Sequence, residues 1–301
     1  MIEFRSVTKR FPDGTLAVEE FDLVIPARKT TVLVGSSGSG KTTLLRMINR
    51  MVDPSSGSIE IDGESVLDRD PVKLRRSIGY VMQNSGLLPH RRVLDNITTV
   101  PRLNGVSRRE AEAAALELMD RVGLDRALAR RYPAQLSGGQ QQRVGVARGL
   151  AADPNILLMD EPFGAVDPIV RAELQVELRR LQSELDKTVV FVTHDIDEAF
   201  LLGDNVVILS KGAHIVQQGA PDEILAAPAD EFVERFIGSD RGKRRLVASA
   251  SRPSQGDDRL LVDAGGYPVG VIAAPGGRIA EGDPNPRARS ISDKTAQAGD
   301  G

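Results

Sequence analysis

The sequence predicts an α/β fold in which a mostly parallel sheet is covered by helices on both faces. Three apolar segments carry this prediction: residues 30–35 (TTVLVG), 156–160 (ILLMD) and 188–193 (TVVFVT). Continuous apolar runs, as opposed to strict alternation, are typical of strands buried on both faces, as in a parallel sheet. Helical patterns lie between these segments, which agrees with an α/β architecture.

The composition is that of an ordinary globular chain. Of its 301 residues 41% are hydrophobic and 27% charged, so one large domain or two ordinary ones are expected. The absence of cysteine excludes disulfides and thiolate metal sites, and it agrees with a reducing, cytosolic setting. A net charge of −3 gives no support to a nucleic-acid partner. The start (MIEFR) lacks a signal-peptide pattern and no apolar stretch of about 18 residues occurs, so we expect a membrane role only through partner subunits.

We expect a boundary near residue 240. Residues 1–240 form one α/β unit in this interpretation, and residues 241–301 form a linker and low-complexity tail dominated by Gly, Pro, Ala and Ser. Within the tail, residues 260–272 (LLVDAGGYPVGVI) have a strand–turn–strand pattern with Gly265 and Gly266 at the turn. From about Gly276 onward we expect disorder.

Further elements follow from apolar runs and capping residues. Short strands are predicted at residues 79–83 and 206–209, and helices at 41–51 and 140–151. Capping preferences mark other helices: one begins after Ser107, with Glu110 as its capping partner, and stops at Gly123, and others begin at Asp167–Pro168 and at Pro221.

A phosphate-binding loop is predicted between the first apolar strand and the helix that follows it. The segment matches G-x-x-x-x-G-K-[ST]: Gly35, Ser36, Ser37, Gly38, Ser39, Gly40, Lys41 and Thr42, with Thr43 next in the chain. Glycines let the backbone curl so that its N–H groups and the helix start face an anion. Lys41 is expected at the β- and γ-phosphates and Thr42 on Mg²⁺. A plain flexible turn explains neither Lys41 nor the flanking elements.

Two acidic residues end the second apolar strand. Asp160 suits an Mg²⁺ ligand that acts through water, and Glu161 suits a general base that polarises the attacking water. A simpler explanation is that the two acids only keep the end of the strand in contact with water. This explanation is less fitting than a catalytic role in a chain that also has a phosphate loop.

The segment LSGGQ, Leu136 to Gln140, resembles the signature of the ABC ATPase family. Ser137, Gly138, Gly139 and Gln140 open a predicted helix, whose N-terminus is itself an anion site. The resemblance implies that this turn completes the ATP site of a second, identical or similar subunit, and hence a homodimer.

Other positions match family motifs in order. Gln83 is similar to the Q-loop glutamine that senses Mg²⁺ and the attacking water, and His194, one of three histidines, is similar to the switch histidine at the γ-phosphate. Asp167 resembles the D-loop aspartate that reaches across the dimer, although GAVD departs from the usual SALD. Phe11 stands where the family places an aromatic that stacks on adenine, and Phe11 could equally be a core residue near Phe4 and Phe21.

The resemblance covers residues 1–240 and implies the family's layout. A P-loop NTPase (RecA-like) core is expected beside an N-terminal antiparallel β subdomain and a helical subdomain over about residues 87–150. It also implies membrane permease subunits as partners, with the chain peripheral on the cytoplasmic face of the cell membrane.

Several stretches are similar to the osmoprotectant importer ATPases (glycine betaine, carnitine, choline or proline). They are residues 79–90 (GYVMQNSGLLPH), 131–133 (RYP), 160–164 (DEPFG), 192–199 (VTHDIDEA) and 232–238 (FVERFIG). A substrate-binding protein is then an indirect partner. Many members carry tandem CBS domains next; residues 241–301 are too few for a pair, so 260–272 is at most a CBS-like remnant.

Three alternatives stay open at this point. The chain could serve an importer for another small solute, such as an amino acid or polyamine. A soluble ABC protein acting on DNA or ribosomes is less fitting, because the chain has neither a coiled-coil insertion nor a second nucleotide domain. A P-loop kinase is disfavoured by the segment Leu136 to Gln140.

Overall fold

The computed structural model describes residues 1–164, 166–238, 247–248, 259–262 and 268–272. Its contacts divide the chain into two compact units, Met1–Ser239 and Asp240–Gly301, which are described separately. The linker at residues 240–245 and the tail from Gly276, for which disorder is expected, lie outside the described residues.

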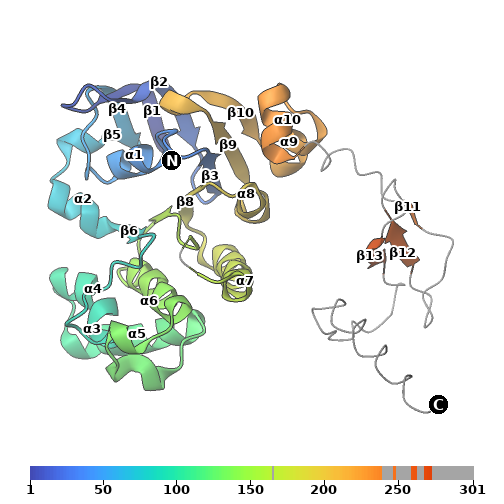
Figure 1. Ribbon diagram of the computed structural model, residues 1–301. Helices are drawn as coiled ribbons and strands as arrows, with labels where there is room; N and C mark the ends of the chain where they lie inside the picture. Colours follow the sequence, from blue (N-terminus) through green and yellow to red (C-terminus); the bar gives the residue numbers. More distant parts are fainter. Residues whose placement is uncertain (165, 239–246, 249–258, 263–267, 273–301) are drawn as a thin grey trace, which may run out of the picture. The chain divides into compact units, whose positions relative to one another are not determined.

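A six-stranded sheet forms the centre of the first unit (Figure 1). Its order is β10-β9-β3-β8-β7-β6. The strands from β9 to β6 in this order are all parallel, whereas β10 pairs antiparallel with β9. The strands are β3 (Thr30–Gly35), β6 (Ile78–Val81), β7 (Ile156–Asp160), β8 (Thr188–Thr193), β9 (Asn205–Leu209) and β10 (Ile215–Gly219). Every residue of β3, β7 and β8 is buried, as the continuous apolar runs predict.

Both faces of this sheet are covered. Val32 and Val34 of β3 belong to one core cluster, together with Val144 and Leu174 from two helices, whereas Leu33 belongs to a second cluster. Alternate residues of one strand point to opposite faces, so each cluster occupies one face. The helices of this core are α1 (Lys41–Ile48), α2 (Pro71–Ser77), α7 (Pro168–Leu185), α8 (Ile196–Leu202), α9 (Pro221–Ala226) and α10 (Glu231–Ile237).

An antiparallel sheet of four strands forms the N-terminal part, with the order β2-β1-β4-β5. Its strands are β1 (Ile2–Arg10), β2 (Leu16–Ile25), β4 (Ser56–Ile61) and β5 (Glu64–Ser65). Phe4 and Phe21 from this sheet meet edge to face at 5.3 Å and lie in the same cluster as Leu44 of α1. The antiparallel sheet is therefore packed against the helix that follows the phosphate loop.

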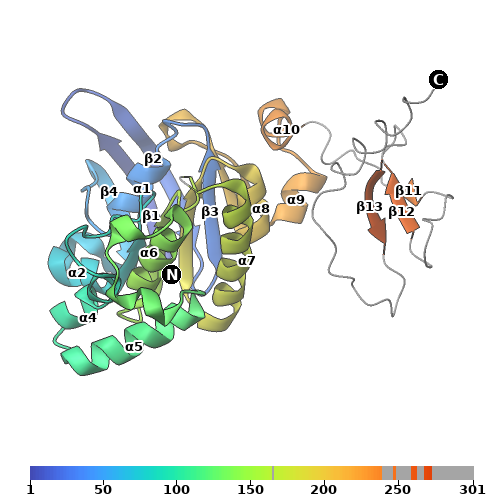
Figure 2. The same cartoon turned by 60° about the horizontal axis from the view of Figure 1, so that its bottom comes forward.

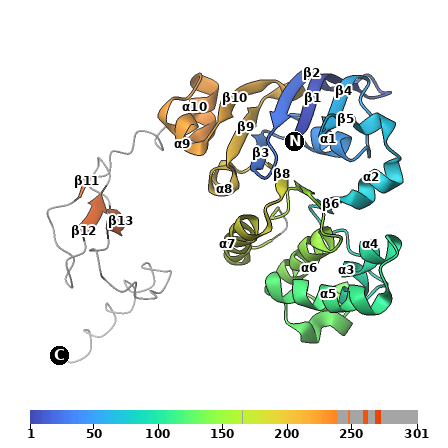
Figure 3. The ribbon, with the colours of Figure 1, turned by 180° about the vertical axis from the view of Figure 1, so that it is seen from behind.

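Four helices lie together beside β6: α3 (Val93–Ile97), α4 (Thr99–Leu103), α5 (Arg108–Arg121) and α6 (Gly138–Leu150) (Figure 3). Ser107 caps α5 by accepting from the Glu110 amide, and Gly123 follows the helix with φ of 66°, as the capping residues predict. Helix α6 also contacts α7, and Figure 2 shows the two helices side by side.

Some predicted boundaries were wrong. The helix expected over residues 140–151 is α6, which begins two residues earlier because Ser137 is its N-cap. The helix expected over residues 41–51 ends at Ile48, because Arg50 takes a left-handed conformation and the Met51 amide turns back to the Arg46 carbonyl. The strand expected over 79–83 is Ile78–Val81, so Gln83 lies beyond the strand in a turn closed by the Ser85 amide on the Met82 carbonyl (3.0 Å).

The second unit holds a three-stranded antiparallel sheet, with β11 (Val247–Ala248), β12 (Arg259–Val262) and β13 (Pro268–Ile272) in that order. The pairing of β12 with β13 agrees with the strand pattern of residues 260–272, and the expected turn at Gly265 and Gly266 lies outside the described residues. Among the helices described, none is long and apolar enough to cross a membrane.

Candidate functional site

The loop from Gly35 to Gly40 wraps around the ammonium group of Lys41. The Lys41 Nζ donates to the carbonyl oxygens of Gly35 and Ser36, both at 2.8 Å, and to the Ser39 hydroxyl at 3.2 Å. Burial lowers the pKa of Lys41, and the nearby charges of Glu161 and Asp160 oppose that shift. A buried ammonium held by weak neutral acceptors can turn to a stronger anionic partner such as a phosphate.

The loop needs glycine for conformation and for space. Gly38 and Gly40 have φ values of 79° and 90°, in the left-handed region. A Cβ at Gly40 would lie 2.5 Å from the carbonyl oxygen of Ala17 in β2, so the loop also touches the antiparallel sheet. The arrangement leaves a curled backbone at the N-terminus of α1, which favours an anion.

Two side-chain oxygen groups of the kind that a hard cation prefers meet next to this loop. The hydroxyl of Thr42, in the first turn of α1, donates to Oδ1 of Asp160 at 2.8 Å. Mg²⁺ prefers oxygen atoms and binds through one or two side chains together with waters and substrate phosphates. The pair fits this ion because it places a hydroxyl and a carboxylate beside the phosphate loop. Thr43, the next residue after Thr42, is half-buried.

Glu161 is the meeting point of three segments. Its Oε2 accepts from the Gln83 side-chain amide at 3.2 Å and lies 3.3 Å from Nδ1 of His194. Glu161 itself is in a left-handed conformation, with φ of 44°, and its amide donates to the Val192 carbonyl of β8. Its side chain is 22% exposed, so the carboxylate stays accessible to water while its orientation is held.

The parallel sheet explains why these residues lie close together. The phosphate loop follows β3, Gln83 follows β6, Asp160 and Glu161 end β7, and His194 follows β8, and these four strands are neighbours. Parallel strands end at one edge of the sheet, which is where ligands bind in open α/β sheets.

The turn after Gln83 is supported from α6. The guanidinium of Arg148 donates to the carbonyl oxygens of Ser85 (2.6 Å) and Gly86 (2.7 Å). Burial lowers the pKa of Arg148. Arg148 thus connects the helix that begins at the Ser137–Gln140 turn with the loop that carries Gln83.

The Ser137–Gln140 turn has a closed capping box. The Ser137 hydroxyl accepts from the Gln140 amide (3.3 Å), and the Gln140 side chain accepts from the Ser137 amide (3.0 Å), so these two amides are not free. Gly139 packs on α7, where a Cβ would lie 2.3 Å from Cγ1 of Val170. Within the part of the chain described, no hydrogen bond joins this turn to the phosphate loop.

Asp167 and Phe11 have only local contacts among the interactions described for the chain. Asp167 caps α7, with its carboxylate accepting from the amides of Ile169 and Val170. Phe11, in the connection between β1 and β2, is half-buried, unlike the core residues Phe4 and Phe21, and the ammonium of Lys9 lies 5.2 Å from its ring centre.

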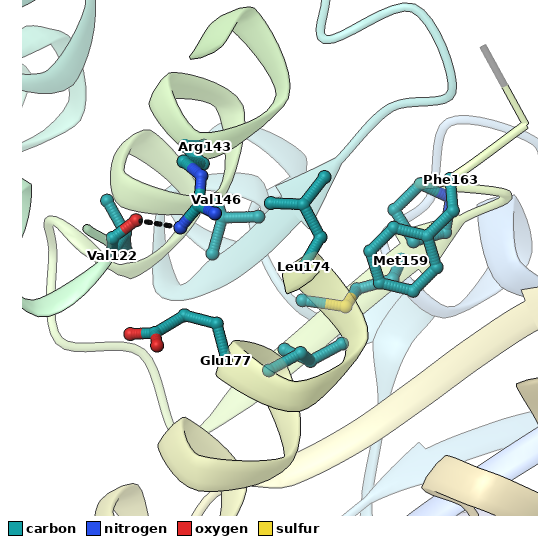
Figure 4. Close-up of a pocket in the computed structure, with 9 residues that line it drawn as sticks. Val122, Arg143, Val146, Met159, Phe163, Leu174 and Glu177 are labelled. Atoms are coloured by element: carbon teal, nitrogen blue, oxygen red, sulfur yellow. Dashed lines mark hydrogen bonds between the residues drawn. The ribbon is translucent and has the colours of Figure 1, made fainter. Parts of the chain in front are cut away.

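A small apolar cavity lies between α6, α7 and β7 (Figure 4). Met159, Phe163 and Leu174 are among its lining residues, and its volume of ≈ 20 Å³ is about that of one water molecule. At its rim Arg143 donates to the Val122 carbonyl at 2.8 Å. The cavity is too small and too apolar for a nucleotide.

Sequence reasoning missed three residues that support this site: Arg46 and Tyr80, which contact the Asp160 carboxylate, and Arg148. Arg46 stands four residues after Thr42 on α1 and so shares its helix face, which is a signal that could have been used. The other two contact the site from distant segments, and no local pattern marks them.

Comparisons with known proteins agree with this geometry. The ABC transporter family model matches residues 18–164. The choline transport ATP-binding protein OpuBA of Bacillus subtilis is 49% identical over 261 residues, which are 87% of this chain and 67% of that protein. The glycine betaine/carnitine/choline transport ATP-binding protein OpuCA of the same organism is 52% identical over 249 residues, which are 83% of this chain and 64% of that protein. A solved ATP-binding cassette, described as a dimer in a post-hydrolysis state bound to ADP and Pi, has a TM-score of 0.67 and 34% identity and covers 73% of this chain and 99% of that one.

The chain therefore belongs to the ABC transporter family, as one of its ATP-binding domains. The α/β architecture with its antiparallel sheet and helices is the one that the resemblance predicts. The relatives in Bacillus subtilis are named for the transport of choline, or of glycine betaine, carnitine and choline, and this chain spans about two thirds of their length.

Proposed function

We propose that this chain is the ATP-hydrolysing subunit of an osmoprotectant importer, for a quaternary amine (glycine betaine, carnitine or choline) or for proline. The observation that carries the hydrolytic part is the carboxylate of Glu161, held by Gln83 and His194 beside the Lys41 loop. The importer and the solutes glycine betaine, carnitine and choline are supported by the names of relatives that are about half identical to the chain, whereas proline rests on the resemblance in sequence alone.

The phosphate loop binds the nucleotide in this proposal. Lys41 exchanges the carbonyl oxygens of Gly35 and Ser36 for phosphate oxygens, and the amides at the start of α1 donate to the same anion. Phe11 stacks on the adenine ring, because it is half-buried and lies outside the core formed by Phe4 and Phe21.

Thr42 and Asp160 would hold Mg²⁺, with Gln83 as a further ligand. The ion supplies positive charge at the β- and γ-phosphates. Glu161 accepts a proton from the attacking water, and His194 donates to the γ-phosphate. The contacts of Gln83 and His194 orient the Glu161 carboxylate so that one oxygen stays open to water.

A homodimer completes two such sites. The Ser137–Gln140 turn of each copy faces the phosphate loop of the other, and Asp167 reaches across the interface. In support, this turn has no hydrogen bond to its own loop within the described chain, while a structural relative is described as a dimer. The surface around Gln83 to Arg92 contacts the permease subunits on the cytoplasmic face of the membrane. Closure of the dimer moves these permease subunits. A substrate-binding protein delivers the solute.

The variant Glu161→Gln tests the hydrolytic role. It keeps the side-chain shape and removes the base, so we expect unchanged ATP binding, stable ATP-bound dimers in size-exclusion chromatography and a fall in phosphate release of about 100-fold or more. Glu117→Gln, on the exposed surface of α5, is the matched control and should behave as wild type. Full steady-state activity of Glu161→Gln would refute the general-base assignment.

The solute is tested in liposomes that contain the chain, its permease and its binding protein. Betaine, choline, carnitine and proline are offered in turn, and stimulation of ATP hydrolysis by one of them is expected. Hydrolysis that none of the four stimulates would remove the osmoprotectant assignment and favour an importer of another small solute.

A further inference from the structure

The carboxylate of Asp160 has partners that the motifs do not include. It is buried, with 7% of its surface exposed, and both of its oxygens are engaged. Oδ1 accepts from the Thr42 hydroxyl at 2.8 Å. Oδ2 accepts from the Tyr80 hydroxyl at 3.2 Å and lies 3.7 Å from a guanidinium nitrogen of Arg46.

The fold explains how Tyr80 reaches this carboxylate. Tyr80 of β6 pairs in parallel register with Leu158 of β7, and Asp160 is two residues further along β7. Leu158 and Asp160 point to the same face of the sheet because side chains alternate along a strand. A tyrosine is long enough to extend from the position beside Leu158 toward the carboxyl end of β7, where its hydroxyl meets Asp160.

Helix α1 supplies the other two partners from one face. Thr42 and Arg46 are four residues apart, so both point toward the carboxyl end of β7. Thr42 takes one oxygen of Asp160 and Arg46 lies near the other. The Arg46 side chain is 48% exposed and lies at the longer distance, so the hydroxyl of Tyr80 is the closer partner of Oδ2.

This arrangement fixes the rotation of the Asp160 side chain. A carboxylate with one engaged oxygen can turn about its terminal torsion, which has a broad energy minimum. With Tyr80 on Oδ2, Oδ1 stays directed at Thr42. Without Tyr80, Oδ2 retains only the longer contact with Arg46, and the carboxylate can rotate away from the Thr42 side.

We propose that Tyr80, assisted by Arg46, is a positioning residue that orients Asp160 for Mg²⁺. This inference rests on the proposed role of Thr42 and Asp160 as the magnesium pair. It assigns to the strand before Gln83 a part in metal binding that is distinct from the part of Gln83 itself.

The test is Tyr80→Phe, which removes one hydroxyl and keeps the ring. Binding of a fluorescent ATP analogue is titrated with Mg²⁺ at fixed nucleotide, and with nucleotide in EDTA. We expect the Mg²⁺ concentration at half-saturation to rise about tenfold, because a hydrogen bond to a charged group is lost. Affinity in EDTA should stay within about twofold of wild type. Tyr132→Phe, at a tyrosine that is 41% exposed, is the matched control and should change neither value.

Two results would overturn the inference. One is an unchanged Mg²⁺ half-saturation in Tyr80→Phe. The other is an equal loss of affinity with and without Mg²⁺, which indicates that the hydroxyl only supports the fold of the site. The wild type distinguishes a failure of the proposed function from a failure of this inference. If the wild type does not bind nucleotide, the proposed function is wrong. If both proteins show the same Mg²⁺-dependent binding, only the role of Tyr80 is wrong.

Discussion

The variant Arg148→Met should destabilise the protein by removing the support of the turn after Gln83. The guanidinium donates to the carbonyl oxygens of Ser85 and Gly86, at 2.6 and 2.7 Å. Methionine keeps the apolar stem and the helix propensity but offers no donor. The residue Ser85 is 3% exposed, so water cannot readily replace the lost partner of its carbonyl group.

The magnitude follows from two opposing contributions. A hydrogen bond from a charged group contributes about 1.5–3 kcal/mol, so the two bonds amount to about 3–6 kcal/mol. The cost of burying the guanidinium, which also lowers its pKa, is recovered in the variant and offsets part of this. We expect a net loss of about 3 kcal/mol, which for a domain of about 240 residues lowers Tm by about 6–12 °C.

The assay is thermal unfolding followed by circular dichroism, with Arg109→Met on the exposed surface of α5 as the matched control. The control should shift Tm by less than about 2 °C, since exposed substitutions usually change stability by less than about 0.5 kcal/mol. If Arg148→Met changes Tm no more than the control does, the two hydrogen bonds do not stabilise the turn and the reasoning is refuted.

The other predictions concern binding and pH. Lys41→Ala should weaken ATP binding by more than about tenfold, measured by fluorescent nucleotide titration, and unchanged affinity would contradict the phosphate-loop role. Phe11→Ala should weaken ATP about tenfold but leave inorganic triphosphate unchanged, and an equal loss on both would identify Phe11 as a structural residue. Burial raises the pKa of Glu198, against the opposing hydrogen bond from Thr193. A raised folded pKa makes the carboxylate costly at neutral pH and less costly as pH falls through that pKa, so Glu198→Gln should gain more Tm over wild type at about pH 7.5 than at about pH 5.5. A gain independent of pH would contradict this.

The buried strands of the central sheet could be predicted because each one is a short run of consecutive apolar residues. The segments 30–35, 156–160 and 188–193 are β3, β7 and β8 with the predicted bounds, since short continuous apolar runs are typical of strands buried on both faces. The phosphate loop followed from glycine and lysine spacing, and the helix starts at Ser107 and Asp167 followed from their capping side chains.

The rest depended on contacts between distant segments. Helix α1 stops early because Arg50 turns left-handed, and arginine has no sequence preference that marks such a turn. The contact of Tyr80 with Asp160 requires the order β7-β6 in the sheet, which no single strand reveals. The meeting of Gln83 and His194 at Glu161 likewise depends on three strand ends that come together only in the folded sheet.

Gly40 lies where the phosphate loop approaches two separate parts of the fold. A Cβ there would lie 2.5 Å from the Ala17 carbonyl of β2 and 3.2 Å from the Ala213 side chain, which follows β9. The loop is therefore in close contact with the antiparallel sheet on one side and with the segment between β9 and β10 on the other. A nucleotide that binds only the folded loop should therefore stabilise the contacts of this loop with β2 and with the segment after β9.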